Sequence, residues 1–309
     1  IDSEQYNTEK GQIADLLGEI TSVWYCGVKN RKKAIEQGVT SWRDERCTSA
    51  IMGINGTRAP TIDAILNINR QNVVQLLPHR VTNNAHKWKK ISNDMYVDFE
   101  TLSDIFSSFT DLPRQQCTEM IFMIGVWYQN NSDIESAPWS YTNFVCNSAT
   151  YDEEFRIMNE FGQFVKEQNN PRLWYWYADQ RFWKSAENRQ FDIACDDDDE
   201  KRNDVVSDWK DMRWCDMYDI FKQEPIVIKG CFKFGLKPIA KAMAGHGMIT
   251  TKMESECDSG MMAMVKAWQC YNAEEDPANC DIMRDIAKYN TFDVKVMWDI
   301  MQYLRANHK

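Results

Sequence analysis

The stretch Met95-Tyr-Val-Asp-Phe-Glu-Thr101 constrains the fold of this chain more than any other segment. Apolar and polar residues alternate along it, which is typical of a β-strand with one polar face. In such a strand Asp98 and Glu100 project from the same face. Two neighbouring carboxylates repel each other unless a cation lies between them, and hard oxygen ligands suit Mg²⁺ or Mn²⁺. The pattern predicts a divalent-metal site on a strand, with a solvated edge strand as the alternative.

A second informative segment lies far downstream. Tyr289 and Asp293 are four residues apart in a segment for which periodicity predicts a helix over 281–306. This spacing places both side chains on one helical face, a single turn apart. Taken alone, Asp293 fits an exposed helix acid and Tyr289 a half-buried aromatic residue. In combination with the Asp98 strand, the pair indicates a site assembled from distant segments.

Two further acids are candidates for the same site. The aromatic segment 172–177 predicts a strand, and Asp179 follows it where a helix is expected to begin. The alternative for Asp179 is a role as the N-cap of that helix. Asp216 follows another candidate strand, 213–215, and competes with Asp179 for the same role. Trp176 is a candidate for stacking on an unpaired base, the alternative being a place in the core.

From about residue 91 the sequence is typical of an α/β domain. The apolar segment Met120–Tyr128 predicts a buried strand beside the Asp98 strand. The acidic stretch 192–208 predicts a loop inserted into this domain. We therefore predict one domain over 91–309, with a mixed central sheet flanked by helices at 151–168, 180–188, 236–244, 259–271 and 281–306.

Residues 1–90 differ from the rest in charge and pattern. They contain 13 Lys/Arg and 9 Asp/Glu, whereas the remainder contains 23 and 37. Helical periodicity predicts a small all-α region here. Within it Gly53 and Gly56 precede a predicted helix and resemble the hairpin of a helix-hairpin-helix motif. This hairpin and Arg58 are candidates for contact with a nucleic-acid backbone, and simple packing against the main domain is the alternative.

The order of these segments resembles the DEDD exonuclease superfamily, in its tyrosine variant, on the ribonuclease-H-like fold. The family's first motif, Asp-x-Glu, matches Asp98 and Glu100. Its last motif, Tyr-x-x-x-Asp, matches Tyr289 and Asp293, and its second acid best matches Asp179. The likeness is greatest to predicted RecB-family nucleases that carry a ribonuclease-H-like C-terminal domain.

The resemblance implies a metal-dependent 3′–5′ exonuclease that hydrolyses phosphodiester bonds of DNA or RNA with two Mg²⁺ or Mn²⁺ ions. It implies that Tyr289 orients the attacking water and that four carboxylates hold the ions: Asp98, Glu100, Asp179 and Asp293. The sequence around the second motif departs from that of many relatives, so Asp216 stays the alternative to Asp179. The expected partner is a nucleic acid with a single-stranded end. An additional N-terminal nuclease domain, missing from this chain, would match the organisation of the relatives.

Two other classes of function remain open on the same fold: a catalytically inactive nucleic-acid-binding or assembly module, and a structure-selective endonuclease. No apolar run approaches the roughly 18 residues that a membrane span requires, so no membrane partner is expected. Ten cysteines without a Cys-x-x-Cys pair favour free thiols in a reducing compartment. The chain also begins at Ile1 without a secretory leader, and we expect a cytoplasmic or nuclear protein.

Overall fold

A computed structural model describes residues 4–72, 74–103, 119–129, 137–196, 199–252, 255–257 and 259–309. The chain divides into two compact units, each assembled from separated segments. Unit 1 comprises Ile1–Ala85, Tyr218–Ile249 and Tyr303–Lys309, and unit 2 comprises His86–Met217 and Thr250–Gln302.

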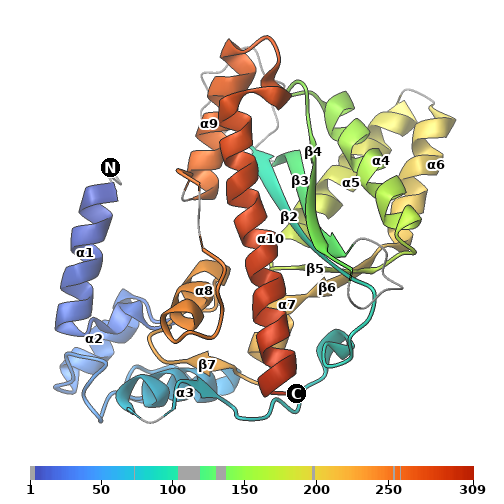
Figure 1. Cartoon of the computed structure of the whole chain (residues 1–309). Coiled ribbons are helices and arrows are strands. Elements are labelled where there is room, and N and C mark those ends of the chain that lie inside the picture. Colours follow the sequence, from blue (N-terminus) through green and yellow to red (C-terminus); the bar gives the residue numbers. More distant parts are fainter. Residues whose placement is uncertain are drawn as a thin grey trace. The chain divides into compact units, whose positions relative to one another are not determined.

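Unit 2 is built on a five-stranded mixed sheet with the order β4-β3-β2-β5-β6 (Figure 1). Its strands are β2 (Asp94–Leu102), β3 (Met120–Gln129), β4 (Trp139–Val145), β5 (Arg172–Tyr175) and β6 (Arg213–Asp216). Strand β3 pairs antiparallel with both β2 and β4, whereas β5 runs parallel to β2 and β6 parallel to β5. The predicted α/β class with a mixed central sheet is therefore confirmed.

Helices cover both faces of this sheet (Figure 1). Phe99 of β2 packs on Trp183 of α5, with ring centroids 5.9 Å apart. On the other face, Trp139 of β4 lies 5.6 Å from Trp298 of α10. The helical elements of unit 2 are η3 (Ala85–Lys87), α4 (Tyr151–Glu167), α5 (Asp179–Asp196), α6 (Glu200–Asp208), η4 (Trp209–Asp211), α9 (Gly260–Ala273), η5 (Pro277–Asn279) and α10 (Asp281–Asn307). Ala85 and the part of α10 from Tyr303 belong to unit 1, whereas Met217, the first residue of α7 (Met217–Gln223), belongs to unit 2.

The acidic stretch 192–208 is helical over most of its length, which corrects the predicted loop. Helix α5 continues to Asp196, and α6 occupies Glu200–Asp208. The Asp199 side chain caps α6 by accepting the Arg202 N–H at 3.0 Å. Ala194 and Val206 are buried, so each helix has an apolar anchor that the high charge of the segment conceals.

Unit 1 consists of short elements: α1 (Glu4–Leu17), η1 (Ile20–Ser22), α2 (Val28–Glu36), η2 (Gly56–Arg58), α3 (Ala59–Arg70), β1 (Leu76–Leu77), α7 (Met217–Gln223), β7 (Val227–Ile228) and α8 (Leu236–Gly245). The predicted contiguous all-α region 1–90 differs from this unit in two ways. Strand β1 pairs antiparallel with β7, and the segments 218–249 and 303–309 belong to the same compact unit. The Trp24 N–H donates to the Phe232 carbonyl at 2.9 Å, one of the long-range hydrogen bonds that join the segments.

The segment before the predicted hairpin is a run of turns, so the structure does not have the expected helix-hairpin-helix form. Helix α2 ends at Glu36, and no further helix begins before η2. The Asp63 carboxylate of α3 accepts the Ser49 N–H and the Ser49 hydroxyl, both at 2.8 Å, and holds a turn where the first helix of the motif would run. Gly53 and Gly56 do have positive φ angles of 67° and 72°, as a tight turn requires.

Among the described residues, no helix has both the length and the apolar character that a membrane crossing requires.

The nine described cysteines are free thiols, seven of them buried. Cys117 lies outside the described residues.

Candidate metal centre

Three of the predicted ligands meet on the face of the sheet that α10 covers. Carboxylate oxygens of Asp98, Glu100 and Asp293 lie within 4.8 Å of one another. Asp98 and Glu100 come from β2, and Asp293 comes from the middle of α10. Glu100 and Asp293 are only 4% and 6% exposed, while Asp98 is half-buried. Segments almost two hundred residues apart therefore form one compact acidic cluster, which we call the carboxylate cluster.

A side chain that the sequence did not single out joins two members of the carboxylate cluster. Asn290 is fully buried, and its Nδ2 donates to Asp98 Oδ2 at 2.9 Å and to Glu100 Oε1 at 3.3 Å. Its Oδ1 accepts the Tyr141 hydroxyl of β4 at 3.1 Å. Asn290 thus holds the two carboxylates of β2 side by side and is itself held by Tyr141 of β4, two strands away in the sheet.

Gly125 creates the space that Asn290 occupies. It lies opposite Asp98 in the β2–β3 ladder. A Cβ atom at this position would lie 1.4 Å from Asn290 Oδ1 and 3.0 Å from the Tyr141 hydroxyl. Only glycine permits so close an approach of α10 to the sheet. A glycine inside an otherwise apolar strand is the one sequence signal that could have indicated this contact.

Two tyrosines adjoin the cluster, Tyr289, which is buried, and Tyr141, which is half-buried. Burial raises the pKa of the Tyr289 hydroxyl above its usual value, and the charges of Asp293, Glu100 and Asp98 add to the effect. Burial likewise raises the pKa of the Tyr141 hydroxyl, and Glu100 and Asp98 again contribute. Both phenols therefore stay protonated at neutral pH, and Tyr289 can act as a hydrogen-bond donor rather than a base.

Asp179 is the first residue of α5 and lies outside the three-carboxylate cluster. It is 5% exposed and accepts the Trp176 N–H at 3.2 Å. Burial raises the pKa of its carboxyl well above the usual value, and the charge of Asp293 contributes more than that of Asp216. Asp179 is thus within electrostatic reach of the cluster, as a fourth ligand would be.

Asp216, the alternative to Asp179, ends strand β6. Its carboxylate is half-buried and accepts the Tyr177 N–H at 3.0 Å. Because β2, β5 and β6 run parallel, the residues at their carboxyl ends lie along one edge of the sheet, where open α/β sheets bind ligands. Both candidates for the second acid therefore lie at this edge.

The donor set of the carboxylate cluster fits Mg²⁺ or Mn²⁺. It offers hard carboxylate oxygens from a rigid strand and a long helix. Placing several carboxylates in a buried site is unfavourable unless they are protonated or share a cation. Burial and the charge of Asp293 raise the pKa of the Asp179 carboxyl for the same reason, and a bound cation would favour its charged form.

The candidates for nucleic-acid contact are divided between the units. Gly53, Gly56 and Arg58 belong to unit 1, where the Arg58 guanidinium lies 3.8 Å from the centroid of the Tyr25 ring. Trp176 belongs to unit 2 and is half-buried in the turn between β5 and Asp179. Its neighbour Trp174 is a core residue whose Nε1 donates to Asp94 at 2.9 Å.

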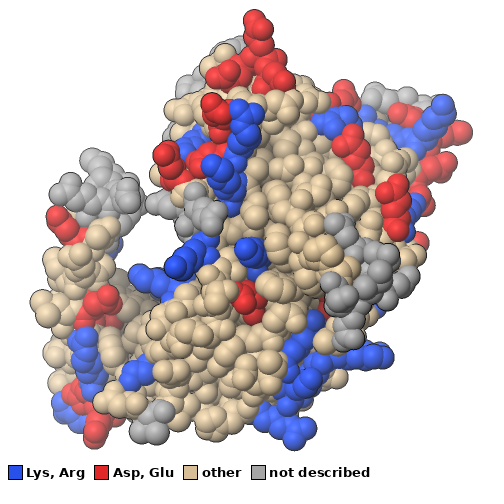
Figure 2. All heavy atoms as spheres, viewed as in Figure 1, with Lys and Arg blue, Asp and Glu red and all other residues tan. Residues whose placement is uncertain are grey.

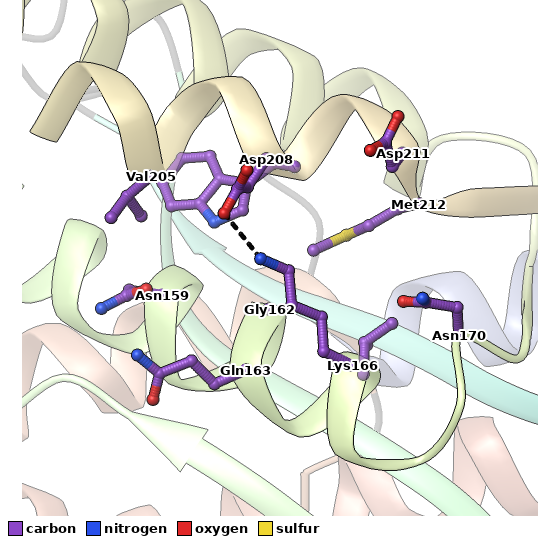
Figure 3. A pocket seen from close by; sticks show the side chains of 11 residues that line it. Asn159, Gly162, Gln163, Lys166, Asn170, Val205, Asp208, Asp211 and Met212 are labelled. Carbon is purple, nitrogen blue, oxygen red and sulfur yellow. Dashed lines mark hydrogen bonds and ion pairs between the residues drawn. The ribbon is translucent and has the colours of Figure 1, made fainter.

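A different pocket of about 160 Å³ lies between α4 and the α6–η4 segment (Figure 3). Lys166 and Asp208 line it and form an ion pair of 2.6 Å. No member of the carboxylate cluster lines this pocket, so we assign it no part in the proposed chemistry.

No protein-family model matches the chain, and no curated protein or solved structure matches it either. A functional proposal for this protein therefore depends on the chemistry of its own residues and on the motif resemblance.

Proposed function

We propose that this protein is a metal-dependent exonuclease of the tyrosine-type DEDD class, on a ribonuclease-H-like fold. The observation that carries the proposal is the convergence of Asp98, Glu100 and Asp293 within 4.8 Å, with Tyr289 one helical turn before Asp293. A mixed sheet with helices on both faces supports the proposed fold. The action on DNA or RNA and the 3′–5′ direction from a single-stranded end come from the family resemblance.

Each residue of the centre has a role that its surroundings support. Asp98, Glu100 and Asp293 would hold the divalent ions, with Asp179 as the fourth ligand. Asp179 is preferred to Asp216 because its carboxyl is the more deeply buried and is influenced by Asp293. When bound, Mg²⁺ or Mn²⁺ would stabilise the negative charge that develops on the phosphate and lower the pKa of a bound water.

Three further side chains would orient the water, the metal ligands and the substrate. The Tyr289 hydroxyl keeps its proton and would direct the attacking water by a hydrogen bond. Asn290 keeps the Asp98 and Glu100 carboxylates adjacent, so these two ligands do not need to be gathered when an ion binds. Trp176, close to Asp179 in the chain, would stack on the terminal base.

The test uses end-labelled single-stranded DNA and RNA, incubated with the protein in Mn²⁺ or in EDTA. We expect label release only with Mn²⁺ and a loss of at least about a thousandfold in rate for Asp98→Ala, because the variant lacks one of the carboxylates that would hold the ions. The matched control is Asp281→Ala. Asp281 lies on the same helix as Asp293, but the Asp281 side chain is 94% exposed. This control should keep the wild-type rate.

Binding of the ion is measured separately from activity. Mn²⁺ should raise the thermal midpoint of the wild type and of Asp281→Ala but not that of Asp98→Ala. A midpoint shift without hydrolysis of any substrate would replace the nuclease with an inactive metal-binding module. Cleavage of a circular single strand would identify an endonuclease, since an exonuclease requires an end.

A further inference from the structure

A second charged region lies in unit 1, far in sequence from the carboxylate cluster. Unit 1 contains 17 Lys/Arg and 11 Asp/Glu, whereas unit 2 contains 19 and 35. From Pro225 to Lys252 the chain has five lysines and no acidic residue. Four of them follow one another at intervals of four residues: Lys229, Lys233, Lys237 and Lys241. Figure 2 shows Lys and Arg side chains gathered over the region of α8.

These four lysines and Arg43 line one cleft of about 990 Å³, which we call the lysine cleft. Asp15 is the only acidic residue among those that line it. Lys237 and Lys241 are one turn apart on α8 and so lie on the same side of the helix. Lys237 and Lys241 therefore form a cationic surface on the wall of the cleft that α8 provides.

Four cations of the lysine cleft, Arg43, Lys229, Lys233 and Lys241, have no acidic side-chain partner among the described residues. The side chains of Lys233 and Lys241 form no ion pair with any described residue. Lys229 Nζ donates to Asn72 Oδ1 at 2.7 Å, and Arg43 Nη1 donates to the Leu16 carbonyl at 3.1 Å. These acceptors are neutral, so they fix the two side chains without cancelling their charge.

Aromatic side chains accompany the cations. Trp42 and Phe232 line the cleft, are half-buried, and have ring centroids 4.8 Å apart. The Arg43 guanidinium lies 4.8 Å from the centroid of the Trp42 ring. A groove of cations with aromatic faces along it is typical of proteins that bind single-stranded nucleic acids, because the cations contact phosphates and unpaired bases stack on the rings.

We propose that the lysine cleft binds a single-stranded nucleic acid, with its lysines on the phosphodiester backbone and with Trp42 and Phe232 available to stacked bases. The choice of a nucleic acid among polyanions rests on the proposed nuclease function. The charge and the aromatic lining of the cleft stand independently of that function. The cleft is a binding site only, and no reaction occurs in it.

The test measures fluorescence anisotropy of a labelled single-stranded oligonucleotide with the full chain in EDTA, where the proposed hydrolysis stops. The cleft variant is Lys233→Gln/Lys241→Gln. The matched control is Lys29→Gln/Lys32→Gln, which removes the same charge from exposed positions of α2 that do not line the cleft. We expect about tenfold weaker binding for the cleft variant and a change below about twofold for the control.

The dependence of affinity on salt gives a second readout. Each phosphate contact with a single strand contributes about 0.7 to the slope of log affinity against log salt, so removing two contacts should make the slope shallower by about 1.4. Equal affinities for wild type and cleft variant, or equal weakening by the control, would overturn the proposal. Dextran sulfate, a polyanion without bases, should bind more weakly than the oligonucleotide. Equal binding of the two would overturn the choice of a nucleic acid.

The outcomes separate this inference from the proposed nuclease. If the strand binds in the cleft but is not hydrolysed with Mn²⁺, the nuclease proposal fails and the lysine cleft stands. If hydrolysis requires Asp98 but the cleft variant binds the strand as tightly as the wild type, the nuclease stands and the cleft proposal fails.

Discussion

The two ends of strand β2 both bury carboxylates, but the side chains that meet those carboxylates differ in charge. At the start of the strand, Asp94 is 5% exposed and accepts the Arg172 Nε at 2.7 Å and the Trp174 Nε1 at 2.9 Å. The charge of this carboxylate is compensated by a guanidinium that is itself buried. This end of β2 is therefore complete without any ligand.

From the middle of β2 towards its other end, Asp98 and Glu100 lie beside each other and close to Asp293. Among the described contacts, the amide of Asn290 donates to both strand carboxylates, and this amide is neutral. An amide satisfies hydrogen bonds but adds no positive charge to a cluster of three acids. The Asp94 site therefore stabilises the sheet by an internal ion pair, whereas the site of Asp98 and Glu100 has the composition of a cation site. Substitutions at each end test this contrast, and the largest effect is expected at the start of the strand.

Replacing the buried guanidinium should affect stability most. We expect Arg172→Met to lower the free energy of unfolding by about 4 kcal/mol, because the Asp94 carboxylate would stay buried without its counter-charge. Urea unfolding in EDTA and in Mn²⁺ measures the loss. Mn²⁺ should not recover it, since the ion is expected at the opposite end of the strand. Recovery by Mn²⁺ would remove the distinction between the two ends.

The second prediction concerns the contact between Gly125 and Asn290. Gly125→Ala should cost about 3 kcal/mol, because the added methyl group would occupy the place of Asn290 Oδ1. Asn290→Ala alone should cost about 2 kcal/mol through the lost hydrogen bonds. The double variant should be less destabilised than the sum of the single changes, since the shorter side chain on α10 leaves room for the methyl group.

The control for this cycle is Gly260→Ala in α9, where a Cβ would meet no atom within 4 Å. It should leave stability unchanged or raise it slightly. Mn²⁺ should recover part of the loss in Asn290→Ala, because an ion can hold the two strand carboxylates in place of the amide. Additive effects of Gly125→Ala and Asn290→Ala would show that the two residues do not interact.

The local elements around the carboxylate cluster could be predicted from the sequence. Alternation identified β2, helical periodicity identified α10, and both patterns indicate which residues share a face. Motif order then joined Asp98, Glu100 and Asp293. The predictions of β2 and α10 succeeded because each depends on a single segment whose period matches its structure.

What the sequence did not indicate depends on contacts among several segments. Asn290, Gly125 and Tyr141 come from three elements, and none has a distinctive local pattern besides a glycine in an apolar strand. The extent of unit 1 was missed for the same reason, since its strands β1 and β7 lie far apart in the chain. The acidic stretch 192–208 was misinterpreted because its composition outweighed the few buried positions that anchor its helices.

The smallest effect on stability is expected from a substitution at Asp179. The same substitution distinguishes Asp179 from Asp216 as the fourth ligand. Burial, Asp293 and Asp216 raise the pKa of the Asp179 carboxyl, so the folded protein binds this proton more tightly than the unfolded chain. The contribution of such a group to stability is present at low pH. It is lost as the pH rises from the unfolded value of about 3.9 through the raised folded pKa.

Asp179→Asn keeps an acceptor for the Trp176 N–H but carries no charge. In EDTA at neutral pH we therefore expect its thermal midpoint to be about 3 °C higher than that of the wild type, with a flatter pH dependence above about pH 4. In Mn²⁺ the order should reverse, because the variant lacks a ligand and gains less from the ion. Asp216→Asn is the matched comparison at the neighbouring strand end. If Asp216→Asn loses the Mn²⁺-dependent rise in thermal midpoint while Asp179→Asn keeps that rise, Asp216 replaces Asp179 as the fourth ligand of the proposed centre.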